Sequence, residues 1–477
     1  MLARLEHRGP DDEGEVEVNG SWLGHRRLSI VDVATGHQPL MTSDKGLYLV
    51  GNGEVYNHEE VREWLTDGDY STRSDNEVAL HLIRERGPGA LGELEGMFAF
   101  LAAGDDGTFV AARDPVGIKP LYWAQRDGAV RFASEMAAFD DDWLPHVDVF
   151  PPGHAWTPDG GLERFARAVP AEATGGVPSR DELRNIIVQS VRRQLMGDVP
   201  VGVFLSGGLD STLVAAIAAR ELPEGEKLQT FAVGAEGASD IEAARKAADF
   251  LGSEHHERVY TQQEALAAVP DVVRAIEHFD PSLVRSAVPN YLLAEMTAEH
   301  VKVVLTGEGA DELFAGYEYL HDLTGHGELH DELVRTVEGL HNLNLQRADR
   351  VTMAHGLEAR VPFLDRNVIA LAMRVPAEAK LAGSGEPEKR LLREAFEGWL
   401  PDELLWREKE QFGDGSGAAD VITDVVEDGL SDEEFERERA QLDPPLRTRE
   451  ELHYFRIWKQ HLDGVRPERT VARFATA

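Results

Sequence analysis

The sequence predicts an α/β protein in two parts, an α+β layered domain followed by a domain built on a parallel sheet. Up to about residue 165, short extended runs are separated by glycine turns and interrupted by two helical stretches. Beyond residue 179, apolar runs of strand length lead into glycine-bearing loops and then into helical stretches. This alternation is typical of strand–helix–strand units, whose strands run parallel and whose ligands lie beyond the strands' carboxyl ends.

Composition and charge narrow the classes of protein. A chain of 477 residues, 42% of them hydrophobic, allows two or three domains and a sizeable core. It has no apolar run near the roughly 18 residues of a membrane span and no signal peptide, so we expect a cytoplasmic protein. The net charge of −38 argues against nucleic acid as a partner and favours a halophilic host over a specific acidic binding face. The absence of cysteine excludes disulfides and thiolate metal sites.

The domain boundary is predicted from a change in composition. Residues 1–165 form the first domain, with strands at 47–50, 97–101 and 108–112 and helices at 59–64 and 76–85. Residues 166–178, rich in Ala, Gly and Pro, are interpreted as a linker. Ser179 and Glu182 have the spacing of a capping box and begin the second domain, residues 179–477, whose later part is mostly helical.

The first strand of the second domain leads into the most informative loop. Residues 201–205 form a buried strand, residues 206–211 (SGGLDS) form a turn, and a helix opens on Thr212. The two glycines permit a nest of backbone N–H groups beside a helix N-terminus, which binds an anion. The loop lacks the Lys of a P-loop, and a divalent cation between Asp210 and phosphates explains the carboxylate there. The alternative is an ordinary strand–turn–helix unit.

Another strand, at residues 302–305, runs into Thr306-Gly-Glu-Gly-Ala-Asp311, where carboxylates alternate with glycines. Glu308 and Asp311 are candidates for orienting a nucleophile and for binding Mg²⁺. Asp210 and Asp311, with pyrophosphate oxygens and water, would fill the octahedral shell of Mg²⁺. The alternative is a glycine-rich surface loop.

Two cationic residues follow later in the chain. Arg360 is a candidate for a bidentate pair with a substrate carboxylate, or for a structural bridge to Asp365. Lys409 is a candidate for neutralising charge on phosphates in a transition state, the alternative being a surface lysine.

The first domain carries a set of residues suited to a free amino acid. Arg27 would bind the α-carboxylate and Asp75 the α-ammonium group, while the side chain of Asn52 and the N–H of Gly53 would stabilise an oxyanion. The alternative for the Asn-Gly pair is a hairpin turn.

Taken together, these motifs resemble the glutamine-dependent asparagine synthetases of the B type. In chain order the matching motifs are RGPDD, GHRRLSIVD, NGEVYNH, ARDPVGIKPLY, FASE, PPGH, SGGLDS, TFAVG, LTGEGADELFAGY, GLEARVPFLD and REKEQFGDG. The resemblance implies an Ntn-type (N-terminal nucleophile) α+β sandwich glutaminase domain, truncated here, followed by a pyrophosphate-loop ATPase-like domain. It also implies ATP and Mg²⁺, adenylation of the aspartate side chain, and amidation by ammonia channelled from glutamine.

The resemblance further implies roles for individual residues. The residues implied to bind glutamine are Arg27, Leu28, Ser29, Ile30, Val31, Asn52, Gly53, Glu54 and Asp75. Those implied to bind ATP and its pyrophosphate are Leu205, Ser206, Gly207, Gly208, Asp210, Ser211, Val233, Thr306 and Gly307. Asp210 and Asp311 would bind the metal, and the catalytic residues would be Glu308, Lys409, Asn52 and Gly53.

One departure concerns the nucleophile. In the family, a cysteine opens the mature chain and its free α-amine acts as the base, whereas this chain opens Met-Leu-Ala-Arg and contains no cysteine. Either the start is assigned too late or the glutaminase activity is lost, and the persistence of the pocket residues favours the first. As written, we expect the chain to use free ammonia.

Other functions stay open at this point. A related synthetase that adenylates another carboxylate, as β-lactam-forming enzymes do, is one alternative, and a non-catalytic nucleotide-binding protein is another. We expect small-molecule partners (aspartate, ATP, and glutamine or ammonia) and neither nucleic acid nor membrane, with a homodimer left open.

Overall fold

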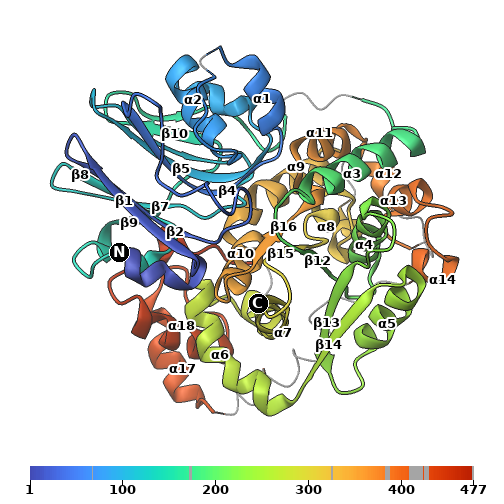
Figure 1. Cartoon of the computed structure of the whole chain (residues 1–477). Coiled ribbons are helices and arrows are strands. Elements are labelled where there is room, and N and C mark those ends of the chain that lie inside the picture. The colour runs from blue at the N-terminus through green and yellow to red at the C-terminus, as the bar shows by residue number, and fades with distance from the viewer. Residues whose placement is uncertain are drawn as a thin grey trace.

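The computed structural model describes residues 1–66, 68–170, 175–323, 326–381, 387–407, 423 and 429–474. The first domain lies at the upper left of Figure 1 and the second at the lower right. Within the described residues, no helix is long and apolar enough to cross a membrane.

The first domain is a layered α+β sandwich, as predicted. Its main sheet is antiparallel with the order β11-β10-β6-β5-β4-β3. The strands are β3 (Leu40–Met41), β4 (Leu47–Val55), β5 (Gly96–Gly104), β6 (Phe109–Arg113), β10 (His154–Thr157) and β11 (Gly161–Arg164). Helices α1 (His58–Trp64) and α2 (Glu77–Arg86) cover one face (Figure 1).

Two smaller sheets cover the other face of the main sheet. One is the hairpin of β1 (Asp12–Val18) and β2 (Ser21–Arg27), and the other has the order β8-β7-β9. Its strands are β7 (Tyr122–Arg126), β8 (Ala129–Ala133) and β9 (Val147–Val149). Alternation along β4 explains the layering, because Leu49 belongs to the core beneath the helices and Val50 to the core beneath the hairpin.

The second domain is built on a five-stranded parallel sheet with the order β14-β13-β12-β15-β16. The strands are β12 (Val201–Phe204), β13 (Gln229–Ala235), β14 (Glu254–Tyr260), β15 (Val303–Leu305) and β16 (Glu358–Arg360). Both faces are buried, since Val303 and Leu305 belong to one hydrophobic core and Val304 to another. From β12 the chain adds strands first on one side and then on the other, so β12 and β15 flank a switch point, where ligands bind in open α/β sheets.

Helices cover both faces of this sheet and form the rest of the domain (Figure 1). Around the sheet are α3 (Arg180–Gln194), α4 (Leu209–Glu221), α5 (Ser239–Leu251), α6 (Gln262–Ile276), α7 (Pro281–Ala298) and α8 (Ala310–Leu313). The helical remainder contains α9 (His326–Gly339), α10 (Asn344–Met353), α11 (Arg366–Arg374), α12 (Ala377–Lys380), α13 (Arg390–Ala395), α14 (Asp402–Leu405), α17 (Asp432–Glu438), α18 (Arg449–His461) and α19 (Pro467–Thr470). The N-cap of α3 is Ser179, whose hydroxyl accepts a hydrogen bond from the Glu182 N–H.

The predicted start of α4 was wrong by a turn. The helix begins at Leu209 rather than Thr212, because Gly208 is an extended N-cap with φ −70° and ψ 162°. Asp210 therefore lies in the first helical turn, not in the loop before it. Gly207 has φ +71°, and a Cβ there would lie 2.4 Å from the backbone carbon of Ala243, so this position requires glycine.

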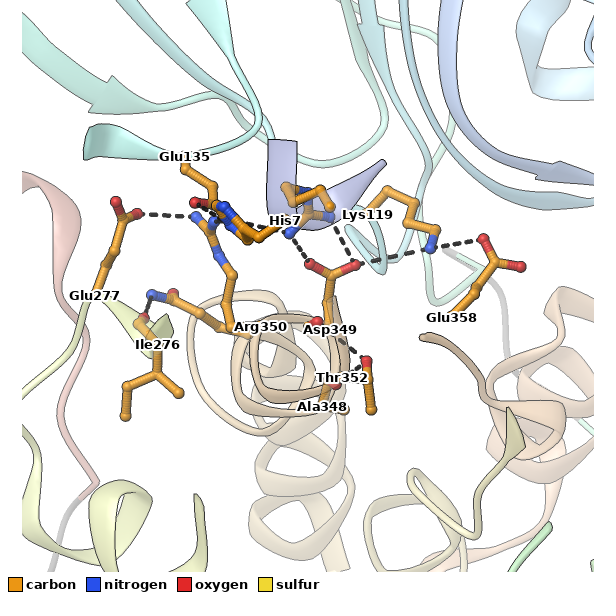
Figure 2. Close-up of polar contacts among 12 residues, drawn as sticks. His7, Lys119, Glu135, Ile276, Glu277, Ala348, Asp349, Arg350, Thr352 and Glu358 are labelled. Carbon is orange, nitrogen blue, oxygen red and sulfur yellow. Dashed lines mark hydrogen bonds and ion pairs between the residues drawn. The ribbon is translucent and has the colours of Figure 1, made fainter. Parts of the chain in front are cut away.

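The two domains meet across buried ion pairs (Figure 2). Arg8 lies 3.1 Å from Glu135 and 2.8 Å from Asp349, and Arg350 lies 2.7 Å from Glu135. All four side chains are less than a tenth exposed. Buried charges are tolerated only when paired, so these contacts fix how the domains sit on each other.

Two candidate active sites

The first candidate site is a cavity of about 110 Å³ that opens in the first domain at the boundary with the second. The residues proposed from the sequence that line it are Arg27, Leu28, Ile30, Val31, Asn52, Gly53, Glu54 and Asp75. Ser29 is not among the lining residues, and its N–H donates to Asp11 Oδ2 at 2.7 Å. From the second domain, Met353 and Glu358 complete the wall.

Arg27 offers a fixed positive charge in this cavity. Its side chain is buried, and its guanidinium donates to the carbonyl oxygens of Val31 at 3.0 Å and Asp32 at 2.9 Å. These contacts with uncharged carbonyl groups hold the guanidinium of Arg27 in one orientation and leave its positive charge in place, which suits bidentate binding of a carboxylate.

Two carboxyl groups face the same cavity. Asp75 accepts a hydrogen bond from the Val55 N–H at 2.6 Å, and burial raises its pKa. Burial raises the pKa of Glu54 well above its ordinary value, and the charges of Asp75 and Glu358 add to the effect. A ligand that carries an ammonium group would favour the ionised forms of both acids.

Asn52 and Gly53 lie inside β4, so the interpretation as a hairpin turn was wrong. They pair with Ala99 and Phe98 of β5. Gly53 has φ +129°, and a Cβ there would lie 1.9 Å from the Met97 carbonyl oxygen. The Nδ2 of Asn52 is buried and has no hydrogen-bond partner among the described residues, which leaves it as a donor to a ligand.

The second candidate site lies where the loops after β12 and β15 touch. A Cβ on Gly307 would lie 2.9 Å from the Cβ of Asp210 and 3.0 Å from the Ser211 nitrogen. The loop after β15 is packed against the first turn of α4, with Thr306 buried, so the interpretation as a surface loop was wrong. The contact brings Asp210 and Asp311 to one place at the switch point of the sheet.

Lys389 joins the two aspartates. Its Nζ lies 2.5 Å from Asp210 Oδ2 and 2.7 Å from Asp311 Oδ1, and its side chain is buried. Burial opposes the charge of Lys389, but Asp210 and Asp311 outweigh burial and raise its pKa above the ordinary value. The residue is the N-cap of α13, with φ +58°. No pattern in the sequence distinguishes it from other lysines, so it was missed.

Glu308, which was predicted to be catalytic, pairs with Arg347 of α10. Arg347 also donates to Ser286 Oγ at 2.8 Å, which ties α10 to α7 behind the loop. Arg347 was not singled out from the sequence, because its position in a helix does not indicate that it contacts the loop of Glu308.

Glu312, next along the same loop, is fully buried. It accepts hydrogen bonds from Tyr317 OH at 2.5 Å and from Asn344 Nδ2 at 3.2 Å. Burial raises the pKa of Glu312 to about 7, and Asp311 contributes in the same direction. Burial therefore favours the protonated form of this carboxyl.

A divalent cation fits the donor set at Asp210 and Asp311. No group of three or more His, Asp or Glu side chains in the described part of the chain is arranged to hold a metal ion by itself. The two carboxylates supply hard oxygen ligands and lie close enough together that both contact the ammonium group of Lys389. Mg²⁺ commonly takes one or two protein carboxylates and completes its shell with phosphate oxygens and water.

Comparison with known proteins decides the family. A family model described as asparagine synthase matches residues 182–326 and 321–463, and one described as a glutamine amidotransferase domain matches residues 1–149. Asparagine synthetase B [glutamine-hydrolyzing] of Escherichia coli (strain K12) is 40% identical over 480 residues, which cover 95% of this chain and 86% of that protein. The chain belongs to the glutamine-hydrolysing asparagine synthetase family.

Eukaryotic members of the asparagine synthetase family are similarly close. The asparagine synthetase [glutamine-hydrolyzing] of Asparagus officinalis is 43% identical over 439 residues, covering 87% of this chain and 74% of that protein. A probable asparagine synthetase [glutamine-hydrolyzing] of Schizosaccharomyces pombe is 40% identical over 495 residues, covering 96% and 88%. These relatives confirm the resemblance carried by the motifs.

Two of the sequence interpretations need separate comment. Lys409 lies outside the described residues, so its role stays a prediction. The interpretation of Arg360 as a bridge to Asp365 was wrong, because Arg360 pairs with Glu358 at 3.0 Å and with Glu54 at 3.4 Å. Its pairing with a substrate carboxylate stays a prediction. The pairing of Arg360 with Glu54 depends on how the two domains pack, and sequence spacing does not reveal it.

Proposed function

We propose that this chain makes asparagine, by adenylating the side-chain carboxylate of aspartate with ATP and then amidating it. The observation that carries the proposal is the convergence of Asp210, Asp311 and Lys389 beside the loop of Glu308, in a member of the asparagine synthetase family. In this reaction the carboxylate oxygen attacks the α-phosphorus, pyrophosphate leaves, and ammonia displaces AMP from the acyl carbon.

The pyrophosphate is proposed to bind at residues 206–211, with Leu205, Val233, Thr306 and Gly307 beside the nucleotide. Support comes from the start of α4, because the backbone N–H groups and the dipole at a helix N-terminus favour anions. Mg²⁺ bound at Asp210 and Asp311 would supply charge neutralisation on the phosphate oxygens. Lys389 holds the same two carboxylates and adds a fixed positive charge.

Glu308 is proposed to act at the acyl group. Its carboxylate, which pairs with Arg347, is suited to accept a proton as ammonia attacks the acyl-adenylate. The two partners of this ion pair lie on separate elements, Glu308 on the loop after β15 and Arg347 on α10, so the pair fixes the position of the carboxylate. Lys409 is proposed to place a positive charge beside the phosphates.

The first-domain cavity is proposed to bind glutamine. Arg27 would bind the α-carboxylate, Asp75 the α-ammonium group, and Asn52 with the Gly53 N–H the oxyanion formed during hydrolysis. The family's nucleophile is a thiol, and these 477 residues contain no cysteine. We therefore propose ammonia as the nitrogen donor for the chain as given. We also propose that residues 1–165 are the amidotransferase domain, residues 179–477 the synthetase domain, and residues 166–178 the linker between them. The proposed location of the protein is the cytoplasm.

The test is a product assay on the 477-residue chain with ATP, Mg²⁺ and aspartate. We expect AMP and pyrophosphate to appear with ammonium and not with glutamine alone, and Asp210→Asn to abolish both products. Release of ADP and orthophosphate would contradict the proposal. Equal pyrophosphate release with other carboxylates in place of aspartate would instead support a related synthetase.

A further inference from the structure

Arg360, the last residue of β16, lies between the two candidate sites. Its guanidinium lies behind the wall of the first-domain cavity, with Nη2 3.4 Å from Glu54 Oε1 and Nε 3.0 Å from Glu358 Oε1. Both acids line that cavity, one from each domain. Arg360 is thus a residue of the second domain whose charge is balanced by the wall of the first-domain cavity.

The backbone of Arg360 holds the loop of the second site. Its carbonyl oxygen accepts a hydrogen bond from the Thr306 N–H at 2.9 Å, which extends the pairing of Leu305 with Arg360. Thr306 opens the loop that carries Glu308 and Asp311. The side chain of Arg360 therefore contacts two residues that line the first cavity, and its main chain contacts the loop of the second site.

The contact between Glu54 and Arg360 is incomplete in this structure. Nη2 of Arg360 and Oε2 of Glu54 are both buried and have no hydrogen-bond partner among the described residues. Buried polar atoms are nearly always paired, and leaving a buried donor unpaired costs about 1–3 kcal/mol. A second state in which these two groups form a full bidentate pair would satisfy both.

The charge on Glu54 decides between the two states. Asp75 and Glu358 oppose its ionisation, whereas Arg360 and Lys119 favour it. A ligand whose ammonium group binds Asp75 cancels one of the opposing charges. The pair then tightens, because charge-assisted hydrogen bonds are stronger and shorter than neutral ones.

We propose that Arg360 is a positioning residue that couples the two sites: an ammonium-bearing ligand in the first cavity charges Glu54, closes the Glu54–Arg360 pair and fixes the Thr306 loop for ATP. The inference rests on the proposed function for the identity of the ligands, glutamine and ATP. It assigns Arg360 no contact with either substrate.

Two measurable consequences follow. Glutamine should tighten the binding of an ATP analogue about fivefold or more, and the analogue should tighten glutamine by the same factor, since coupling between two sites is reciprocal. Glutamine binding should also release protons, because it lowers the pKa of Glu54, which burial raises.

The experiment is titration calorimetry on the 477-residue chain with glutamine and α,β-methylene-ATP, each alone and each with the other saturating. Two buffers of different ionisation enthalpy give the proton count. Glu54→Gln keeps the shape of the side chain and removes its charge. Glu135→Gln is the matched control, since Glu135 also pairs across the domain boundary, with Arg8 and Arg350, but does not line the cavity.

We expect coupling and proton release in the wild type and in Glu135→Gln, and neither in Glu54→Gln. The proposal is overturned if the wild type shows no coupling, if Glu54→Gln keeps it, or if Glu135→Gln loses it too. Loss of all glutamine binding in Glu54→Gln would also overturn it, by making Glu54 a direct ligand. The calorimetry contains no aspartate and measures binding alone. Its results therefore stay interpretable even if the chain proves not to catalyse the synthetase reaction.

Discussion

The ammonium group of Lys389 lies 2.5 Å from Oδ2 of Asp210, inside the loop region where a phosphate-binding metal is proposed. The same ammonium lies 2.7 Å from Asp311. In the absence of a divalent cation, this lysine keeps two carboxylates from repelling each other.

Replacing Lys389 with methionine should therefore reveal the metal site. Without the ammonium group, Asp210 and Asp311 repel, so we expect a lower Tm in chelator and a larger rise in Tm with Mg²⁺ than in the wild type. Pyrophosphate release should fall about 100-fold, as when one transition-state charge partner is removed. Thermal unfolding with and without Mg²⁺ checks the first outcome.

Lys380→Met is the matched control for this variant. Lys380 is also buried, but its Nζ contacts the sulfur of Met373 at 3.9 Å rather than carboxylates. Its loss should leave the response of Tm to Mg²⁺ unchanged. An equal response in both variants would show that burial of a lysine, and not its position between the aspartates, governs the effect.

Lys380 should also make stability depend on pH. Burial lowers the pKa of Lys380 to about 7, so below pH 7 the folded state holds a buried charge at full cost. As pH rises from 7 toward 10.5 the folded state loses that proton first, and the wild type should gain about 3–5 kcal/mol relative to Lys380→Met. Denaturant unfolding of both proteins at pH 7 and pH 9.5 measures the difference, and parallel curves would contradict the prediction.

Glu312→Gln should show the opposite sign. The pKa of Glu312 is about 7 in the folded protein, whereas an unfolded carboxyl ionises near 4.5, so the folded state is penalised as pH rises through this window. Glutamine keeps an acceptor for Tyr317 and removes the penalty, so the variant should gain about 3 kcal/mol over the wild type between pH 4.5 and 7. A stability difference that is the same at pH 5 and pH 8 would refute it.

Gly53→Ala should disrupt the pairing of β4 with β5 beside the first cavity. The added Cβ would lie 1.9 Å from the Met97 carbonyl oxygen at φ +129°, so β4 and β5 must separate, at a cost on the order of 3–5 kcal/mol. Gly87→Ala is the control, since Gly87 also has positive φ (+79°) but no atom near its Cβ position, and it should cost only about 1–2 kcal/mol. Thermal unfolding and glutamine titration compare the two variants.

The parts of the fold that could be predicted from sequence are those with a local signal. β12 and β15 are buried apolar runs, and each was predicted to within one residue. β14 and β16 were missed, because β14 reads Glu-His-His-Glu-Arg-Val-Tyr and β16 has only three residues, Glu-Ala-Arg. Both are edge strands of the sheet, which pair through backbone groups and need no apolar pattern.

The candidate sites divide in the same way. The motifs around Asp210 and Glu308 were found because glycine and carboxylate residues at fixed spacing have a chemical meaning within one loop. Lys389 and Arg347 were missed because each acts on a carboxylate far away in the sequence, at Asp210 and Glu308. The halophilic interpretation of the net charge of −38 stays a prediction.

By itself, the sequence determined the family, the order of domains and the loops that carry the chemistry, since strand period, glycine turns and motif spacing are properties of neighbouring residues. The tertiary structure alone decided which charges meet. Arg360 pairs with Glu54 rather than Asp365, and Lys389 joins Asp210 to Asp311. The reason is physical: a buried charge takes whichever opposite charge the packing of distant elements brings within reach, and distance along the chain does not enter that energy.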